Sequence, residues 1–199
     1  MTGCRFQKIL CFLCLFSLLY CFFLRNSFAD RHDTVKAGDC FPNIPLIGQF
    51  CQEDKKYLCL SGRKAYSLSH IQADFILVEI FSIYCPICQK HADKFNRLHK
   101  MVQEDSLVSK NMKMIGIGAG NNDREIAYFR KYFNISFPLI PDSDYKIHKA
   151  LKETRAPFIA IIDKRSKPYK ILTILDFNKE PEILLKDIRT QLLKCKPVN

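Results

Sequence analysis

Two cysteines separated by two residues form the motif Cys85-Pro86-Ile87-Cys88. The attacking species in disulfide exchange is a thiolate, and the amides at the N-terminus of a helix favour that form of a cysteine placed there. The second sulfur of such a motif lies about one helical turn on, where it can attack a mixed disulfide formed on the first. The spacing therefore predicts Cys85 as the attacking thiol and Cys88 as the resolving thiol.

Zinc sites use the same spacing, but they take a second pair of ligands from elsewhere in the chain. The other cysteines that follow residue 29 contain no second pair of this spacing; they are Cys40, Cys51, Cys59 and Cys195. Disulfide exchange needs only the two sulfurs, so we expect redox chemistry without a metal or an organic cofactor.

The residues on either side of the motif predict a strand followed by a helix. Phe75–Phe81 is an almost continuous apolar run of strand-forming residues, typical of a buried parallel strand. From Pro86 to about Glu104 the apolar residues have helical spacing, and a proline in the first turn interrupts no helical hydrogen bond. Cys85 is thus expected at the junction between the strand and the helix.

The rest of the chain predicts a mixed α/β sheet with helices on both faces. Further strands are expected at Met112–Ala119, Phe158–Asp163 and Tyr169–Leu175, and further helices at Asp123–Phe133, Asp144–Leu151 and Lys179–Leu193. Upstream, the prolines of Phe41–Leu46 indicate an edge segment or an irregular arm. Tyr57–Leu60 and Ala65–Ser67 are predicted to form a hairpin that turns at Ser61-Gly62.

The first 29 residues have the order of a signal peptide. Arg5 and Lys8 precede an apolar run from Ile9 to Leu24, and small residues at Ser27 and Ala29 suit cleavage after Ala29. The alternative is an uncleaved N-terminal membrane anchor. In both cases we expect residues 30–39 to be a linker and residues 40–195 an exported domain, periplasmic or otherwise extracytoplasmic, that contacts the membrane only through its N-terminal segment.

Composition fits this location. The formal net charge of +11 is spread along the chain, which predicts a basic surface and no nucleic-acid partner. Six cysteines follow residue 29, an even number that suits an oxidising compartment. The four outside the motif allow three full pairings, and Cys51 with Cys59 is the local expectation.

The motif Tyr84-Cys85-Pro86-Ile87-Cys88 after a strand, with Ala156-Pro157 ahead of a late apolar strand, resembles thioredoxin-fold proteins of the TlpA/ResA type and the related AhpC/TSA redoxins. The resemblance covers about residues 36–194. It implies a three-layer thioredoxin-like fold and a thiol-disulfide oxidoreductase. Such a protein exchanges disulfides with protein thiols or disulfides, and a membrane electron donor or acceptor serves it. The motif does not fix whether the pair reduces or oxidises its partners, because that depends on thiolate stability.

The resemblance also implies roles for residues outside the motif. Pro157 takes the place of the cis-proline that faces the cysteines, so Ala156, Tyr84, Pro86 and Ile87 are expected beside it in a substrate groove. Tyr84 stands where a tryptophan is common. Glu79 takes the place of the buried acid that accepts the proton of the resolving cysteine; the alternative is a glutamate on an exposed strand face, paired with a lysine.

Two other functions remain open at this point. A peroxiredoxin-like thiol peroxidase would use Cys85 with Ser82 and Arg155, although Val78 stands where that motif has a proline. A Sco-like copper-binding protein would use His148 with both cysteines, although Sco proteins have three residues between theirs. His91 is expected either to favour the thiolate or to face solvent.

Overall fold

The structure is a computed structural model of the 199-residue chain and describes residues 34–43, 45–48, 50–60 and 66–195. These residues belong to one unit, Thr34–Asn199. The predicted signal peptide or anchor, residues 1–29, and the predicted turn at Ser61-Gly62 lie outside the described residues. Among the helices that the structure describes, none is both long enough and apolar enough to cross a membrane.

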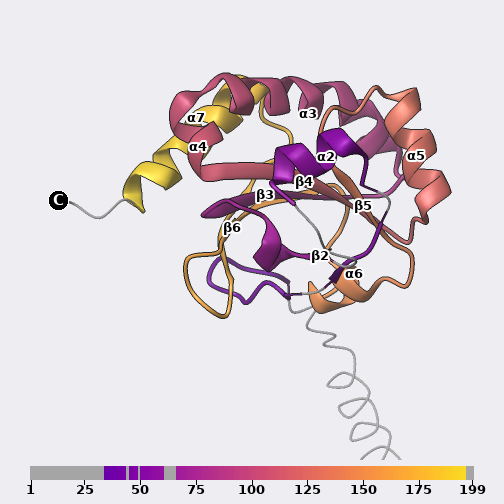
Figure 1. Cartoon of the computed structure of the whole chain (residues 1–199), viewed down its shortest axis with the longest axis horizontal. Helices are drawn as coiled ribbons and strands as arrows, with labels where there is room; N and C mark the ends of the chain where they lie inside the picture. Colours follow the sequence, from indigo (N-terminus) through magenta and orange to yellow (C-terminus); the bar gives the residue numbers. More distant parts are fainter. Residues whose placement is uncertain (1–33, 44, 49, 61–65, 196–199) are drawn as a thin grey trace, which may run out of the picture. The chain divides into compact units, whose positions relative to one another are not determined.

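A five-stranded sheet forms the framework of this unit (Figure 1). In the order β5-β4-β3-β6-β7 the strands are Leu139–Asp142, Met112–Ala119, Phe75–Phe81, Phe158–Asp163 and Lys170–Leu175. β3, β4 and β5 run parallel, whereas β6 and β7 are each antiparallel to their neighbours. Every residue of β3 is buried because β3 is the middle strand of a sheet that is covered on both faces. The predicted mixed sheet is confirmed.

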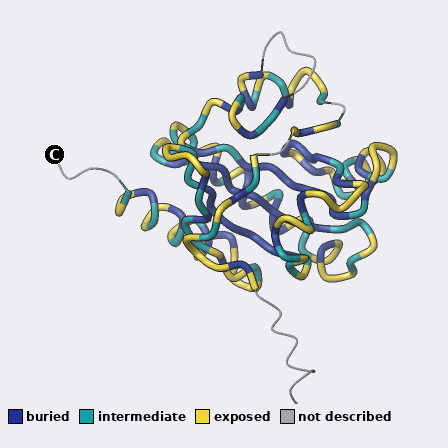
Figure 2. Tube along the Cα trace, turned by 90° about the horizontal axis from the view of Figure 1, so that it is seen from below, coloured by how far each residue is buried: buried dark blue, intermediate teal, exposed yellow. Residues whose placement is uncertain are grey.

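Two hydrophobic clusters separate the sheet from its covering layers. The helices of the first layer are α3 (Pro86–Glu104), α4 (Ser106–Asn111), α5 (Asp123–Tyr132) and α7 (Pro181–Lys194). The second layer contains α6 (Lys146–Ala150), the 3-10 turn η1 (Leu68–His70) and the segment around Val35 and Phe41. Figure 1 shows α3 and α7 on one side of the sheet and α6 on the other, and Figure 2 shows buried segments in the interior with exposed ones around them. The three-layer α/β architecture is therefore confirmed.

The N-terminal part of the unit differs from the prediction. Val35 is buried, Gly38 N donates to Ile171 O at 2.8 Å, and Ile171 N donates to Asp39 O at 2.9 Å. Residues 34–39, which the sequence predicted as the end of a linker, therefore pack on β7. The folded unit begins before residue 40.

The predicted hairpin at Tyr57–Leu60 is wrong. Gln52–Leu58 forms helix α2, because the Cys51 sulfur caps it by accepting from Asp54 N at 3.4 Å and acidic residues occupy its first turn. The short strand β2 (Tyr66–Ser67) pairs with β1 (Pro45–Leu46) instead. Pro45 thus belongs to a small two-stranded sheet outside the main sheet, and Pro42 lies before it.

Helix α2 covers the part of β4 that has no neighbouring strand on its outer side. β5 pairs only with Gly116–Ala119, which leaves the start of β4 unpaired on that side. There Met114 N donates to the Tyr57 hydroxyl at 2.8 Å. An ion pair of 3.0 Å between Asp54 and Arg130 ties α2 to α5.

His99 lies in the contact between α2 and α3. Its ring packs between Tyr57 and Phe137, and Nδ1 lies 2.9 Å from the Ser136 hydroxyl. Burial lowers the pKa of His99 to about 4, with a smaller contribution from the charge of Lys113. The folded state therefore binds a proton at His99 less readily than the unfolded chain does.

We expect His99→Gln to reduce the acid sensitivity of the fold. A lowered histidine pKa means that stability is present at neutral pH and is lost as pH falls from about 6.5 toward about 4. Glutamine does not titrate, so the variant should lose about 2 kcal/mol less than the wild type between pH 7 and pH 4.5. Urea unfolding at both pH values measures this difference. Equal losses in the two proteins would contradict it.

Candidate active site

Cys85 is the N-cap residue of α3. The four residues after β3 form a turn in which Cys85 N donates to Ser82 O at 3.1 Å, and the backbone of Cys85 is extended. The Cys85 sulfur in turn accepts a hydrogen bond from Cys88 N at 3.2 Å. An amide of the first helical turn thus points at the sulfur, and this arrangement stabilises a negative charge there.

The two sulfurs differ in burial. Cys85 is half-buried, whereas Cys88 is only 1% exposed and belongs to the core between the sheet and α3. Burial raises the pKa of the Cys88 thiol, and the neighbouring Cys85 and the carboxyl of Glu79 raise it further. The accessible sulfur is therefore that of Cys85. The thiol of Cys88 lies behind it in the core and needs a nearby base to remove its proton.

Glu79 is a buried acid in the middle of β3. It lies two residues from both Leu77 and Phe81, so it shares their face of the strand, which is directed toward the core that contains Cys88. Its side chain is 5% exposed, and burial raises its pKa to about 8. The alternative of an exposed glutamate paired with a lysine is wrong.

The loop before β6 lies opposite the motif. The Ala156-Pro157 peptide is cis, and the Cys85 thiol donates to Ala156 O at 3.7 Å. The antiparallel pairing of β6 with β3 puts the start of β6 beside the end of β3, which brings this loop to the cysteine. The residues predicted for the groove are exposed at Tyr84, Pro86 and Ile87 and half-buried at Ala156.

Asn121 and Glu125 stabilise the turn in front of Cys85, a role that no pattern in the sequence had indicated. Ile83 N donates to Asn121 Oδ1 at 3.0 Å, and Asn121 is fully buried. The Tyr84 hydroxyl donates to Glu125, whose other oxygen accepts from Asn122 N at 2.8 Å. The bond from Tyr84 and that from Asn122 N lower the pKa of Glu125. The Asn122-x-x-Glu125 capping box is readable from sequence, but its link to Tyr84 is not.

We predict that Asn121→Ala destabilises the protein by about 1 to 3 kcal/mol, because it leaves the Ile83 amide without its acceptor. The reactivity of Cys85 toward a small disulfide should fall as well, since the turn that positions its sulfur loosens. Urea unfolding and the exchange rate test the two effects. Thr190→Ala, at an exposed position of α7, is the control. A variant with the stability and rate of that control would rule out this role.

The residues of the peroxidase alternative, Ser82 and Arg155, lie on the two segments that contact Cys85, whereas His148 of the copper alternative lies on α6. The Ser82 hydroxyl accepts from Tyr84 N at 3.5 Å, and Arg155 is exposed. His148 lies on α6 with Nε2 2.8 Å from Thr154 O. Within the described ranges no three His, Cys, Asp or Glu side chains gather as a metal site, so the predicted copper set is not formed.

His91 is half-buried instead of facing solvent freely. Its ring packs against Phe95 and Phe177, and burial together with two nearby lysines lowers its pKa. The environment of His91 is therefore set mainly by its packing on the surface of α3.

The remaining described cysteines are free thiols; they are Cys40, Cys51, Cys59 and Cys195. The expected pairing of Cys51 with Cys59 is wrong for this structure, because these residues cap opposite ends of α2. The seven residues of α2 lie between them, and eight steps of about 1.5 Å put their Cα atoms about 12 Å apart, well beyond the roughly 7 Å that a disulfide spans.

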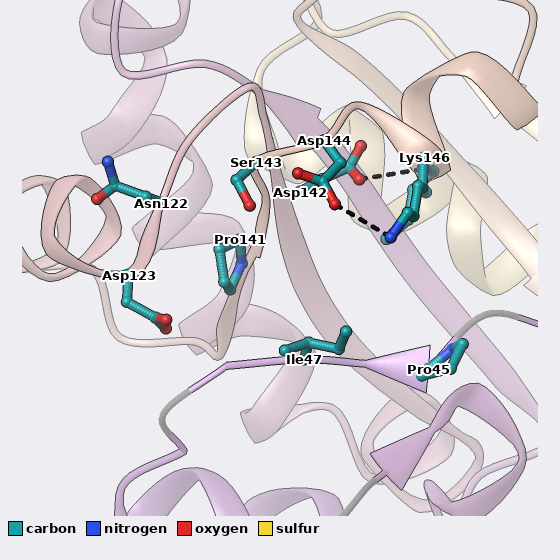
Figure 3. Close-up of a pocket in the computed structure, with 10 residues that line it drawn as sticks. Pro45, Ile47, Asn122, Asp123, Pro141, Asp142, Ser143, Asp144 and Lys146 are labelled. Atoms are coloured by element: carbon teal, nitrogen blue, oxygen red, sulfur yellow. Dashed lines mark hydrogen bonds and ion pairs between the residues drawn. The ribbon is translucent and has the colours of Figure 1, made fainter.

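A pocket of about 230 Å³ lies at the ends of β5 and α6, and it contains none of the predicted site residues. Figure 3 shows Asp142, Asp144 and Lys146 gathered at one end of it. Asp142 accepts from the amides of Ile147 and His148, and Asp144 pairs with Lys146 at 3.0 Å. The carboxylates at this end of the pocket are therefore already bound by other groups of the protein.

The fold and the cysteine pair define a thioredoxin-like protein. Solved structures with this fold include the thioredoxin domain of a thiol-disulfide oxidoreductase from Bacteroides vulgatus, with a TM-score of 0.56, 14% identity, and coverage of 78% of this chain and 99% of that one. A thiol:disulfide interchange protein from Bacteroides sp. has a TM-score of 0.58 and 14% identity over 82% of this chain and 94% of that one. Peroxidoxin BcpB from Mycobacterium tuberculosis has a TM-score of 0.55 and 18% identity over 81% of this chain and 99% of that one.

The sequence is similar to thiol-disulfide oxidoreductase ResA of Geobacillus thermodenitrificans. The two are 21% identical over 138 residues, which are 69% of this chain and 72% of that protein. No family model matches the chain. The chain thus has the thioredoxin-like fold and is similar in sequence to a thiol-disulfide oxidoreductase of the ResA type.

Proposed function

We propose that this chain is an exported thiol-disulfide oxidoreductase that exchanges disulfides with partner proteins through Cys85 and Cys88. The observation that carries the proposal is the asymmetry of the pair. A half-buried sulfur accepts from an amide at the helix N-terminus, and a buried thiol lies behind it next to an acid. An attacking and a resolving cysteine need these two environments.

The reaction has two steps. The Cys85 thiolate attacks one sulfur of the partner's disulfide; a mixed disulfide forms, and the partner's other sulfur leaves as a thiolate that takes up a proton. The Cys88 thiolate then attacks the Cys85 sulfur, so that the Cys85–Cys88 disulfide forms and the partner's second sulfur leaves. Two electrons pass from the protein to its partner, and the reverse sequence oxidises the partner instead.

Glu79 is proposed to accept the proton of Cys88 before the second step. The carboxyl faces the same core as this thiol, and the pKa of about 8 that burial gives it makes it a base suited to neutral solution. Without such a base the buried thiol would ionise slowly, because burial raises the pKa of Cys88.

The substrate groove is proposed to lie between the motif and the loop that precedes β6. Ala156 and Pro157 form one wall, and Tyr84, Pro86 and Ile87 form the other. The 3.7 Å contact from the Cys85 sulfur to Ala156 O supports this location, since it puts a backbone carbonyl beside the attacking atom. An extended peptide of the partner can pair with backbone groups there.

Export and the redox partner rest on the sequence. The order of charges, apolar run and small residues in 1–29 supports a signal peptide or an anchor. A domain of this class outside the cytoplasm needs a supply of electrons or an acceptor for them, so a membrane protein is proposed in that role. The exchange step itself uses no metal and no organic cofactor.

In cells that express the full chain, Cys88→Ala should accumulate mixed disulfides with partner proteins, because the first step proceeds and the second cannot. Cys85→Ala should accumulate none. Non-reducing gel electrophoresis after acid quenching detects the trapped species, and mass spectrometry identifies the partner.

Two results would overturn this proposal. One is the absence of trapped species from both variants. The other is peroxide consumption at a high rate that survives Cys88→Ala and collapses in Arg155→Ala, which would establish the peroxidase function instead.

We predict that Glu79→Gln slows the release of a mixed disulfide by roughly 10²-fold at pH 8, since a positioned base is lost. In the wild type the release rate should rise as pH passes through about 8, where the carboxyl of Glu79 loses its proton, and the variant should lose this rise. Rapid-quench kinetics with a single-cysteine peptide disulfide measures both effects. Glu182→Gln, at an exposed position of α7, is the matched control.

Unfolding does not explain such a loss of rate. The raised pKa of Glu79 means that the stability present below about pH 4.5 is lost as pH rises through about 8, whereas glutamine stays neutral. The variant should therefore be more stable than the wild type at pH 8. An unchanged release rate and pH profile would exclude Glu79 as the base.

A further inference from the structure

The exposed aromatic side chains of this protein are gathered on one region of its surface. In the part of the chain that the structure describes, the large aromatic residues more than a third exposed are all tyrosines: Tyr84, Tyr128, Tyr132 and Tyr145. Tyr84, Tyr128 and Tyr132 are each more than 60% exposed. Clustered exposure of this kind marks interaction surfaces, whereas single exposed apolar residues do not.

Three of these tyrosines, Tyr84, Tyr128 and Tyr132, follow α5 from a position beside Cys85, and we call them the tyrosine ridge. Tyr84 precedes the cysteine, and its hydroxyl donates to Glu125 in the first turn of α5. Tyr128 lies three residues after Glu125 and Tyr132 four residues after that, so all three share one face of the helix. The rings of Tyr128 and Tyr132 stack at 5.7 Å with an angle of 21° between their planes.

Tyr145 closes the ridge on the side of α6. A Cβ atom added to Gly120 would overlap the Tyr145 hydroxyl, so this ring lies against the residue that precedes Asn121. Its phenol also lies near enough to Tyr84 to raise the pKa of that hydroxyl, in addition to the larger effect of Glu125. The aromatic surface therefore surrounds the start of α5.

Two exposed cations flank Tyr128 on α5. Arg124 and Lys131 are exposed on α5, at helical spacings of four and three residues from Tyr128. The carboxylates of this helix lie in its first turn, where Asp123 is exposed and Glu125 accepts from the Tyr84 hydroxyl and the Asn122 amide. A ligand lying along Tyr128 and Tyr132 would thus meet two cations.

We propose that the tyrosine ridge, Tyr84, Tyr128 and Tyr132 with Arg124 and Lys131, binds an acidic segment with apolar side chains next to the reactive cysteine of the partner protein. The inference rests on the proposed function. Tyrosines offer large contact area at a small entropic cost, and the cations favour acidic side chains and speed the encounter. From Glu125 to Tyr132 the helix rises about 10 Å, which matches about three residues of extended chain.

The test compares two synthetic peptides with the reduced full chain. Each carries one cysteine as a mixed disulfide with thionitrobenzoate, and they differ only in the flanking segment, which is Asp-Phe-Glu-Leu in one and Lys-Phe-Lys-Leu in the other. The release of thionitrobenzoate gives the second-order rate constant. The neutral reagent 2-hydroxyethyl disulfide reports the exchange chemistry without a docking segment.

The acidic peptide should react roughly tenfold faster than the basic peptide at low salt, and the ratio should shrink as salt is added. Arg124→Ser with Lys131→Ser should abolish the charge preference, and Tyr128→Ser with Tyr132→Ser should slow both peptides roughly tenfold, since both carry apolar residues. The rate with 2-hydroxyethyl disulfide should stay unchanged in these variants. Ile183→Ser with Lys186→Ser, which removes an exposed apolar residue and a cation from α7, is the matched control.

The outcomes separate the two proposals. If the wild type does not reduce 2-hydroxyethyl disulfide, the proposed function fails. If it does, but the peptides react equally or the α5 variants behave like the α7 control, the ridge is not a docking surface for the partner. Sedimentation that shows a dimer lost in Tyr128→Ser with Tyr132→Ser would also overturn the inference, because a second copy of the chain would then cover this surface.

Discussion

The hydrogen bond from Cys88 N to the Cys85 sulfur depends on where one strand ends and one helix begins. β3 ends at Phe81 and α3 begins at Pro86, so the sulfur stands in front of the first-turn amides. Proline at the first helical position removes no bond from the helix and fixes a backbone angle that suits its start. The core residues of β3 and α3 hold both elements in place, and hence the direction in which the amide points.

The position of Cys88 on the first turn of α3 also explains why a buried glutamate is tolerated in the middle strand of the sheet. A carboxyl at the position of Glu79 cannot reach water, so it is neutral over much of the physiological range unless it exchanges a proton with a neighbour. The neighbouring titratable group on that face is the thiol of Cys88, whose own ionisation is suppressed by burial. The two groups therefore oppose each other's charge, and the core accommodates one negative charge between them more easily than two.

The parts of the fold that the sequence predicted are those with a strong local signal. The apolar run of Phe75–Phe81 and the proline at residue 86 gave the bounds of β3 and α3 as the structure has them. α2 was missed because its cap is a cysteine, which is not among the usual N-cap residues. β5 was missed because it is four residues long and contains Pro141, which only an edge strand accepts. Asn121 contacts Ile83 across 38 residues of chain, and no local pattern signals such a contact.

The cover that α2 provides for β4 has a consequence for the protein before it is fully folded. While Tyr57 is not in place, the Met114 amide and the backbone near it offer an open template to any other extended chain, including another nascent copy. The chain is synthesised from its N-terminus, so residues 50–60 emerge ahead of the strand that they shield. A chain shortened from its N-terminus past α2 would keep Cys85 and Cys88, but it would leave the start of β4 uncovered and would therefore be prone to aggregate.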